Sequence, residues 1–193
     1  MAFSLNEYSE LMNRYKEAVN AAYPEQGFAF DGPVDSVKWF SGKLESRILF
    51  LLKEAYWPAD ECQRCDIMDN PNRFNDSKTN TTISKMMYAI DEVREKIISS
   101  SNEDLENDLV RHIDSVYDRI GQIPKEDLRE SFKNIAVVEI KKIAGNSNST
   151  NGDIEKHGSE FKSFLSDQIS ILNPNIIVCC GPVSWKVLTD YIR

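Results

Sequence analysis

Histidine and cysteine, which build most metal and redox sites, are scarce here: the chain has two histidines and four cysteines among 193 residues. His112 falls in an expected helix and His157 in a polar segment. No serine, histidine and acid arrangement can be assembled around either, so both are expected at the surface. Cys62 and Cys65 form a C-x-x-C pair, but the other two cysteines are adjacent in an expected strand and must point to opposite faces. We therefore expect no metal site and no other cofactor.

Long apolar runs and glycine-rich phosphate loops are also missing. No run of about 18 apolar residues occurs, which predicts a globular chain with no membrane partner. The amino terminus has neither the basic flank nor the apolar core of a secretory leader, so we expect a cytoplasmic protein. No G-x-x-x-x-G-K-S/T sequence is present and no G-x-G-x-x-G follows an expected strand, so neither nucleotide hydrolysis nor nicotinamide chemistry is supported.

Positive charge is in deficit. The 23 basic and 31 acidic residues give a net charge of −8, which disfavours tight, non-specific binding to a polyanion. Residues 91–130 alone carry 12 acidic and 6 basic side chains, whereas Lys133, Lys141 and Lys142 gather near an expected strand. This distribution is compatible with a small basic site on an otherwise acidic surface, so DNA, a nucleobase-containing ligand and a protein are all candidate partners.

The apolar periodicity predicts an α/β fold. Ser4 and Glu7 form a capping box at the start of an amphipathic helix over residues 5–22. Residues 28–37 and 145–152 are interpreted as loops. The other expected helices are 81–99, 103–120, 124–132, 158–172 and 184–192, and the expected strands are 48–52, 134–140 and 176–180. Short right-handed crossovers make these strands parallel in a single domain, 1–193, with a helical insertion at 81–132.

The stretch 47–58 is the best candidate for a site. Five apolar residues, Ile48 to Leu52, are typical of a strand buried on both faces, and Lys53 and Glu54 follow at its carboxyl end. Ligands of parallel sheets bind at that end, so 53–58, 139–150 and 180–185 should converge on one crevice. Glu54 could orient water or stabilise a developing cation. Alternatively, it could form only a salt bridge to Lys53 or Lys142, or a contact with a helix terminus.

Neighbouring residues could bind a ligand. Tyr56 and Trp57 could stack on a flat ligand such as a nucleobase, or they could simply cover the core. Glu139 interrupts an apolar strand near its end, where it must face the crevice or pair with a lysine such as Lys141.

The polar loop that follows this strand has two interpretations. Its residues Asn146, Ser147 and Ser149 could hold a phosphate through hydroxyl groups and backbone amides. The same composition is also typical of a linker.

Three segments together resemble the uracil-DNA glycosylase superfamily: ILFLLKEAYWP (48–58), IAVVEIKKIAG (135–145) and LNPNIIVCCG (172–181). In that family the first strand leads into a Gly-Gln-Asp-Pro-Tyr or Gly-Glu-Ala-Pro-Gly loop that positions the hydrolytic water. A leucine-x-proline, a strand and a glycine precede its last crossover helix. The match covers about residues 47–58 and 134–190. It implies a three-layer α/β/α sandwich with a mainly parallel central sheet, and base excision in DNA repair.

The resemblance assigns roles by position. Glu54 matches the carboxylate of the Gly-Glu-Ala-Pro form, Ala55 matches its alanine, and Lys53 replaces its glycine. Tyr56 or Trp57 would wall the base pocket.

Two departures from the family pattern affect the expected substrate. Glu139 lies near the place of an asparagine that reads the base, and a glutamate there would change which hydrogen-bonding edge is accepted. The family also continues into a further strand and a histidine-proline-serine-like loop, whereas this chain ends at Arg193. We therefore expect a fragment or a shortened relative.

Three functions follow. The first is a DNA glycosylase that hydrolyses the N-glycosidic bond of a flipped, altered base, with Glu54 at the reaction centre and Lys141, Lys142 and the 146–151 loop meeting phosphate. The second is a catalytically silent module of the same fold that binds nucleic acid, a nucleotide or a protein. The third is an enzyme that acts on free nucleosides or nucleotides.

Overall fold

The computed structural model describes residues 4–44, 46–54, 78–99, 105–143 and 150–192. The chain divides into two compact units. Unit 1 consists of Met1–Asp66 and Asn134–Arg193, and unit 2 of Ile67–Lys133. The stretch predicted as a helical insertion falls within unit 2.

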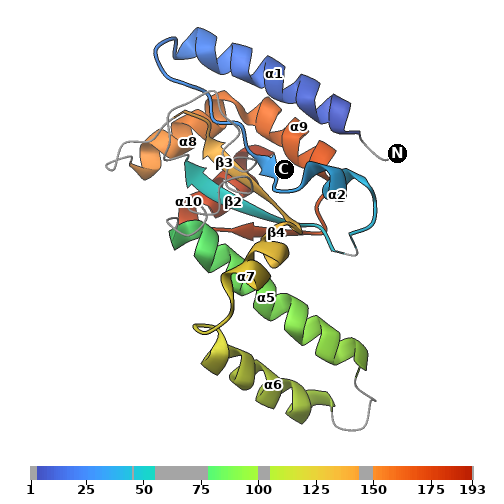
Figure 1. Ribbon diagram of the computed structural model, residues 1–193. Helices are drawn as coiled ribbons and strands as arrows, with labels where there is room; N and C mark the ends of the chain where they lie inside the picture. Colours follow the sequence, from blue (N-terminus) through green and yellow to red (C-terminus); the bar gives the residue numbers. More distant parts are fainter. Residues whose placement is uncertain (1–3, 45, 55–77, 100–104, 144–149, 193) are drawn as a thin grey trace. The chain divides into compact units, whose positions relative to one another are not determined.

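Unit 1 is built on a four-stranded mixed sheet with the order β1-β3-β2-β4 (Figure 1). The strands are β1 (Gly32–Pro33), β2 (Ile48–Glu54), β3 (Ile135–Lys141) and β4 (Ile176–Cys179). β2 pairs in parallel with both β3 and β4, and β1 pairs antiparallel with β3. The α/β class and the three parallel strands are confirmed, with β2 at the centre of the parallel group.

Strand β1 corrects the interpretation of residues 28–37 as a loop. Gly32 pairs with Val137 and Pro33 with Ala136. Gly32 has a φ of 125°, and a Cβ atom placed on it would lie 2.0 Å from the Tyr8 hydroxyl oxygen, so glycine is required there. A two-residue strand contains no alternation of apolar and polar residues, so the sequence pattern could not reveal it.

The helices of unit 1 are α1 (Leu5–Ala22), α2 (Ser36–Phe40), α8 (Asn151–Glu160), α9 (Lys162–Leu172) and α10 (Pro182–Val187), which continues as a π-helical turn, η1 (Leu188–Ile192). Helix α1 has the predicted bounds. Its capping box is formed, because the Ser4 hydroxyl accepts from the Glu7 amide and the Glu7 carboxylate accepts from the Ser4 amide.

Helix α8 corrects two predictions: it begins at Asn151 inside the expected loop 145–152, and the expected single helix 158–172 is two helices. Thr150 caps α8, since its hydroxyl accepts from the Asp153 amide and the Asp153 carboxylate accepts from the Thr150 amide. The chain leaves helical geometry at Phe161, where φ is −108° and ψ is 23°, and α9 starts at the next residue.

An apolar cluster joins one face of the sheet to the helices. Helices α1 and α9 lie side by side (Figure 1) and contribute residues such as Tyr15 and Leu165, which pack with Leu49, Leu51 and Val138 of the sheet. The alternate sheet residues are also buried: Ile48, Phe50, Ile135 and Val137 are each no more than 2% exposed. The central strands are thus buried on both faces, as their apolar runs predict.

Unit 2 consists of helices in its described part: α5 (Lys78–Ser99), α6 (Leu105–Arg119) and α7 (Lys125–Phe132). Helix α5 packs against both α6 and α7. The Glu92 carboxylate pairs with Arg119, and the Glu92 carbonyl oxygen lies 3.2 Å from Nε2 of His112. Across the chain, no helix that the structure describes combines the length and apolar character needed to cross a membrane.

Candidate functional site

Polar side chains gather where the parallel strands end. β2 ends in Lys53 and Glu54, β3 ends in Lys141, and β4 is followed closely by Gly181. The ladder between β2 and β3 places Glu54 directly beside Lys141. Parallel strands present their carboxyl ends at one edge, so this edge is the place where a ligand of such a sheet would bind.

Glu54 and Lys141 form an ion pair at this edge. The Lys141 Nζ lies 3.1 Å from the Glu54 Oε2, and the two side chains are 12% and 9% exposed. A pair so shielded is stronger than one in open water, because the surrounding dielectric constant is lower. The sequence suggested Lys53 or Lys142 as partners of Glu54, and Lys141 as a partner of Glu139. The strand register selects Lys141 for Glu54 instead.

Lys53, at the end of β2, lies close to helices α8 and α10 at the same edge. Its side chain is exposed, and its Nζ donates to the Asn151 Oδ1 at 3.3 Å. A Cβ atom placed on Gly181, whose φ is 120°, would lie 3.5 Å from the Lys53 Cε. Lys53 therefore lies close to the start of α8 and to the start of α10. The structure brings together Lys53, Glu54, Lys141 and Gly181, one or more from each segment expected to converge.

Lys142 and Glu139 lie deeper than expected for ligand-binding residues. Lys142 is fully buried, and its Nζ is 2.5 Å from the Asp31 Oδ2. We therefore place Lys142 in the core rather than beside a phosphate. Glu139 is 2% exposed and shares a face of β3 with Lys141, because side chains two apart in a strand point the same way.

Several predicted site residues lie outside the described residues: Ala55, Tyr56, Trp57, Asn146, Ser147 and Ser149. The C-x-x-C pair, Cys62 and Cys65, lies outside them as well. Cys179 and Cys180 are free thiols, and burial raises the pKa of Cys180. Within the described ranges, no group of three or more histidine, cysteine and acidic side chains is placed to hold a metal ion.

His157 is buried rather than on the surface, which corrects the prediction. It is 2% exposed on α8, and its Nε2 accepts a hydrogen bond from the Lys142 amide at 3.2 Å. Burial, followed by the charges of Lys142 and Lys141, lowers the pKa of His157 from 6.5 to about 3. The imidazole is therefore neutral at physiological pH. Because Nε2 accepts the hydrogen bond from the Lys142 amide, the ring proton is assigned to Nδ1. It supports the end of β3 and is shielded from ligands.

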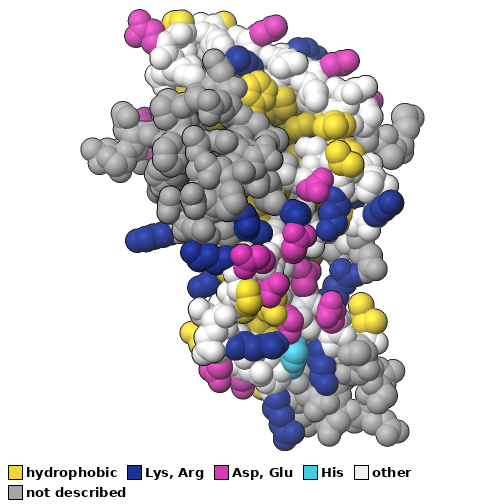
Figure 2. Space-filling view, viewed as in Figure 1, with side chains coloured by type: hydrophobic (Ala, Val, Ile, Leu, Met, Phe, Trp, Pro, Cys, Tyr) yellow, Lys and Arg dark blue, Asp and Glu magenta, His cyan; other side chains and the backbone are white. Residues whose placement is uncertain are grey.

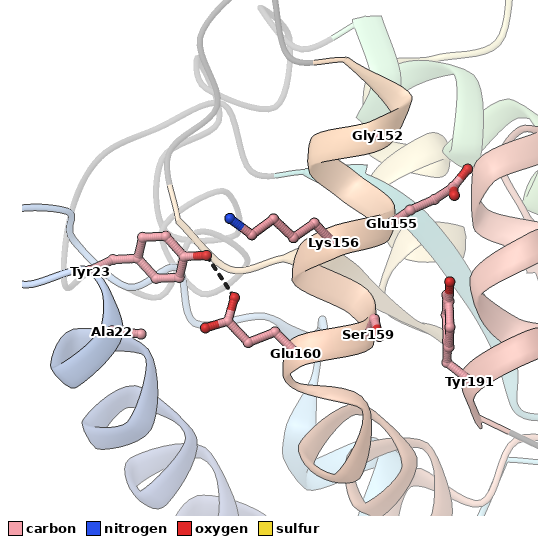
Figure 3. A pocket seen from close by; sticks show the side chains of 8 residues that line it. All are labelled: Ala22, Tyr23, Gly152, Glu155, Lys156, Ser159, Glu160 and Tyr191. Carbon is pink, nitrogen blue, oxygen red and sulfur yellow. Dashed lines mark hydrogen bonds between the residues drawn. The ribbon is translucent and has the colours of Figure 1, made fainter.

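A hollow of about 720 Å³ lies elsewhere in unit 1, between the end of α1, helix α8 and Tyr191 (Figure 3). The Tyr23 hydroxyl donates to the Glu160 carboxylate at 2.8 Å, and Glu155 pairs with Lys186 at 2.7 Å. The lining mixes both charges, and no residue predicted for the site belongs to it. The hollow is therefore distinct from the strand edge.

One residue behind the edge had no assigned role in the sequence: Asp31, which binds Lys142. The available signal for Asp31 was an acid between the apolar Phe30 and the Gly32-Pro33 pair. Asn151, which binds Lys53, was expected only as the last residue of the 146–151 loop that would meet phosphate.

The arrangement can hold one carboxylate in a fixed position beside a lysine, with a second, exposed lysine nearby. Such a carboxylate could orient a water molecule or stabilise positive charge, and the exposed lysine could meet an anionic group. Comparisons of the chain with models of known protein families, with curated proteins and with solved structures find no match, so a function must be argued from this edge and from the sequence resemblance.

Proposed function

We propose that this chain is a DNA glycosylase that hydrolyses the N-glycosidic bond of a flipped, altered base. One observation carries the proposal: a carboxylate, Glu54, stands at the carboxyl end of the central parallel strand and is held by Lys141. In the proposed reaction Glu54 orients the attacking water or stabilises the positive charge that develops on the sugar as the bond to the base breaks. Lys141 keeps the carboxylate in place.

Other residues of the edge have supporting roles in this proposal. Lys53 is exposed and can meet a phosphate of the strand that carries the flipped base. Tyr56 or Trp57 stacks on the base. Lys142 and Glu139, which are both buried, have no role in contacting the ligand.

The proposal includes the three-layer α/β/α architecture of the uracil-DNA glycosylase superfamily. The parallel order β3-β2-β4 supports it, as does the burial of both faces of β2 and β3. A sheet that is buried on both faces needs a layer on each.

A second candidate function is a binding module of the same fold without catalysis. The ion pair itself favours this alternative, because Lys141 already neutralises the charge of Glu54 and occupies one of its oxygens. In that case the edge binds nucleic acid or a nucleotide through Lys53, and no bond is broken.

An excision assay separates these functions. The substrates are single-stranded and duplex oligonucleotides carrying uracil, hypoxanthine or other altered bases, together with free nucleosides. The variants are Glu54→Gln and, as a control at the exposed Glu155–Lys186 ion pair, Lys186→Met. We expect the wild type and the control to release a base from oligonucleotides, and Glu54→Gln to be slower by about 10²–10⁴-fold.

Each other outcome has a meaning. Release of no base from any substrate by folded protein would overturn the glycosylase proposal and leave the binding module. Activity on nucleosides but not on strands would replace the glycosylase with an enzyme of free substrates.

A further inference from the structure

Asp31 holds a buried polar cluster together directly behind the strand edge. Its side chain is fully buried, and its carboxylate accepts three hydrogen bonds. Oδ2 accepts from the Glu139 amide at 2.6 Å and from the Lys142 Nζ at 2.5 Å, and Oδ1 accepts from the Gln168 Nε2 at 2.7 Å. The Asp31 carbonyl oxygen accepts from the Tyr8 hydroxyl at 2.6 Å. Asp31 is thereby anchored to α1, α9 and β3 at once.

The same contacts fix the end of β3 on both sides of Lys141. Glu139 is held through its amide, two residues before Lys141, and Lys142 is held one residue after it. The backbone of Lys142 is also bound, since its amide donates to His157 at 3.2 Å and its carbonyl accepts from the Ala29 amide at 2.7 Å. Lys141 therefore lies between two residues, Glu139 and Lys142, that are both held by hydrogen bonds.

The two adjacent lysines must point in opposite directions. Side chains alternate across a strand, so Lys142 enters the core where Asp31 lies while Lys141 reaches Glu54. A slip of one residue would exchange them and send Lys141 into the core. Removing two charges from water is so unfavourable that a buried pair adds little stability compared with apolar residues. The Asp31–Lys142 pair instead selects the direction in which the two lysine side chains point.

We propose that Asp31 is a positioning residue of the strand edge: by holding Lys142 in the core, it directs Lys141 to Glu54. The inference goes beyond the proposed function, because it concerns the geometry of the edge whatever reaction takes place there. It also assigns a role to the loop before β1, which the resemblance leaves without one.

The test measures the coupling between Glu54 and Lys141 in two backgrounds. Glu54→Gln, Lys141→Met and their combination form a double-mutant cycle. Urea titrations give the unfolding equilibrium constant of each protein. The coupling factor is the ratio between the change measured in the double variant and the product of the changes in the two single variants. One background is the wild type. The other is Asp31→Asn with Lys142→Met, which replaces the buried charges by neutral groups of similar size so that neither charge is left unpaired. A third background, Lys186→Met, is the control.

We expect a coupling factor of about threefold or more in the wild type and in the Lys186→Met control. In the Asp31→Asn, Lys142→Met background it should fall to about one, although the protein remains folded. A residue with only a structural role would change the stability of every variant and leave the coupling factor unchanged. An unchanged factor in this background would overturn the proposal, and so would the absence of coupling in the wild type.

Tyr8→Phe keeps the proposal testable if the doubly altered background does not fold. It removes the hydroxyl that binds the Asp31 carbonyl and the Gln168 amide, without removing a charge. The coupling factor should fall below that of the wild type in this background, and an unchanged factor would contradict the role of Asp31. None of these measurements uses an activity, so failure of the glycosylase proposal and failure of this inference are distinguishable.

Discussion

The Glu54–Lys141 pair is about a tenth exposed, whereas Lys186 of the Glu155–Lys186 pair is half exposed. Shielding decides how much each pair contributes, because breaking a buried pair leaves a charge that water cannot reach. We predict that Lys141→Met lowers the free energy of unfolding by about 1–3 kcal/mol, and that Lys186→Met, which breaks an exposed pair, lowers it by much less. Urea denaturation at neutral pH measures both. Equal losses would mean that the Lys141 pair is as solvated as the exposed one.

His157 makes stability depend on pH. The folded protein keeps the imidazole neutral down to about pH 3, whereas the unfolded chain protonates it near pH 6.5. The unfolded state therefore binds more protons in this window, and lowering the pH favours unfolding. We predict that the wild type loses up to about 1.4 kcal/mol per pH unit, relative to His157→Gln, as the pH falls below 6.5.

Gln is the matched replacement for this experiment, because its amide oxygen can accept the hydrogen bond from the Lys142 amide and it does not titrate. Denaturant titrations of both proteins between pH 7 and pH 4 give the difference. Parallel stability curves over that range would show that His157 is protonated in the folded state as readily as in the unfolded chain.

At the scale of elements, helix α8 contains two glycines in different surroundings. A Cβ atom on Gly158 would lie 2.9 Å from the Val187 Cγ1 and 3.0 Å from the Ile140 Cγ2, so α8 packs closely on α10 and β3 there. Among the described residues, a Cβ atom on Gly152 would meet only the Thr150 Oγ1, at 3.5 Å. The first position is too tight for alanine and the second accommodates it.

We predict opposite effects for the two substitutions. Gly158→Ala should destabilise the protein by about 1–3 kcal/mol, because overpacking forces Val187 and Ile140 to move. Gly152→Ala should leave stability unchanged or raise it by up to about 1 kcal/mol, because alanine favours the helix. Thermal or urea unfolding measures both. A loss of the same size at Gly152 would show that helix geometry, rather than packing against Val187, determines the result.

The helices and strands differ in how well their sequences predict them. Helix α1 and the strands β2, β3 and β4 were predicted, because long periodic runs and a capping box are local signals. The start of α8 was missed, although Thr150 and Asp153 form a capping box there, because the surrounding glycine, asparagine and serine are typical of a loop. Strand β1 has no local signal at all, since its pairing with β3 depends on tertiary contacts.

The sequence predicted where the candidate site lies, but it did not predict which lysine pairs with Glu54. The sequence placed Glu54 at a strand end, but which lysine faces it depends on the register between β2 and β3. The burial of Lys142 and His157 was missed for a related reason. Both residues are polar, and their burial depends on distant partners: Lys142 pairs with Asp31, more than a hundred residues earlier in the chain, and His157 accepts a hydrogen bond from the Lys142 amide.

For the whole molecule, the net charge of −8 limits how nucleic acid can bind. On the face shown in Figure 2, basic and acidic side chains are interspersed rather than separated into a broad basic patch. Lys53 and Lys141 are the described basic side chains at the strand edge, so few phosphates can be contacted there. Each contact with a single strand contributes about 0.7 to the slope of log affinity against log salt.

We therefore predict a salt slope between about −0.7 and −1.4 for binding of a single-stranded oligonucleotide. Fluorescence anisotropy across a series of salt concentrations measures it. Lys53→Met should reduce the magnitude of the slope by about 0.7, and Lys186→Met should leave it unchanged. A slope several times steeper would require a wide basic surface, and a slope of zero would exclude phosphate contacts.

The rate at which a free base leaves a modified oligonucleotide tests most directly whether Glu54 is the catalytic carboxylate of a base-excising site. Mass spectrometry of the released base, under single-turnover conditions at neutral pH, compares the wild type with Glu54→Gln. We predict release by the wild type and a rate about 10²–10⁴-fold lower for the variant. Equal rates for the two folded proteins, or no release by the wild type, would contradict it.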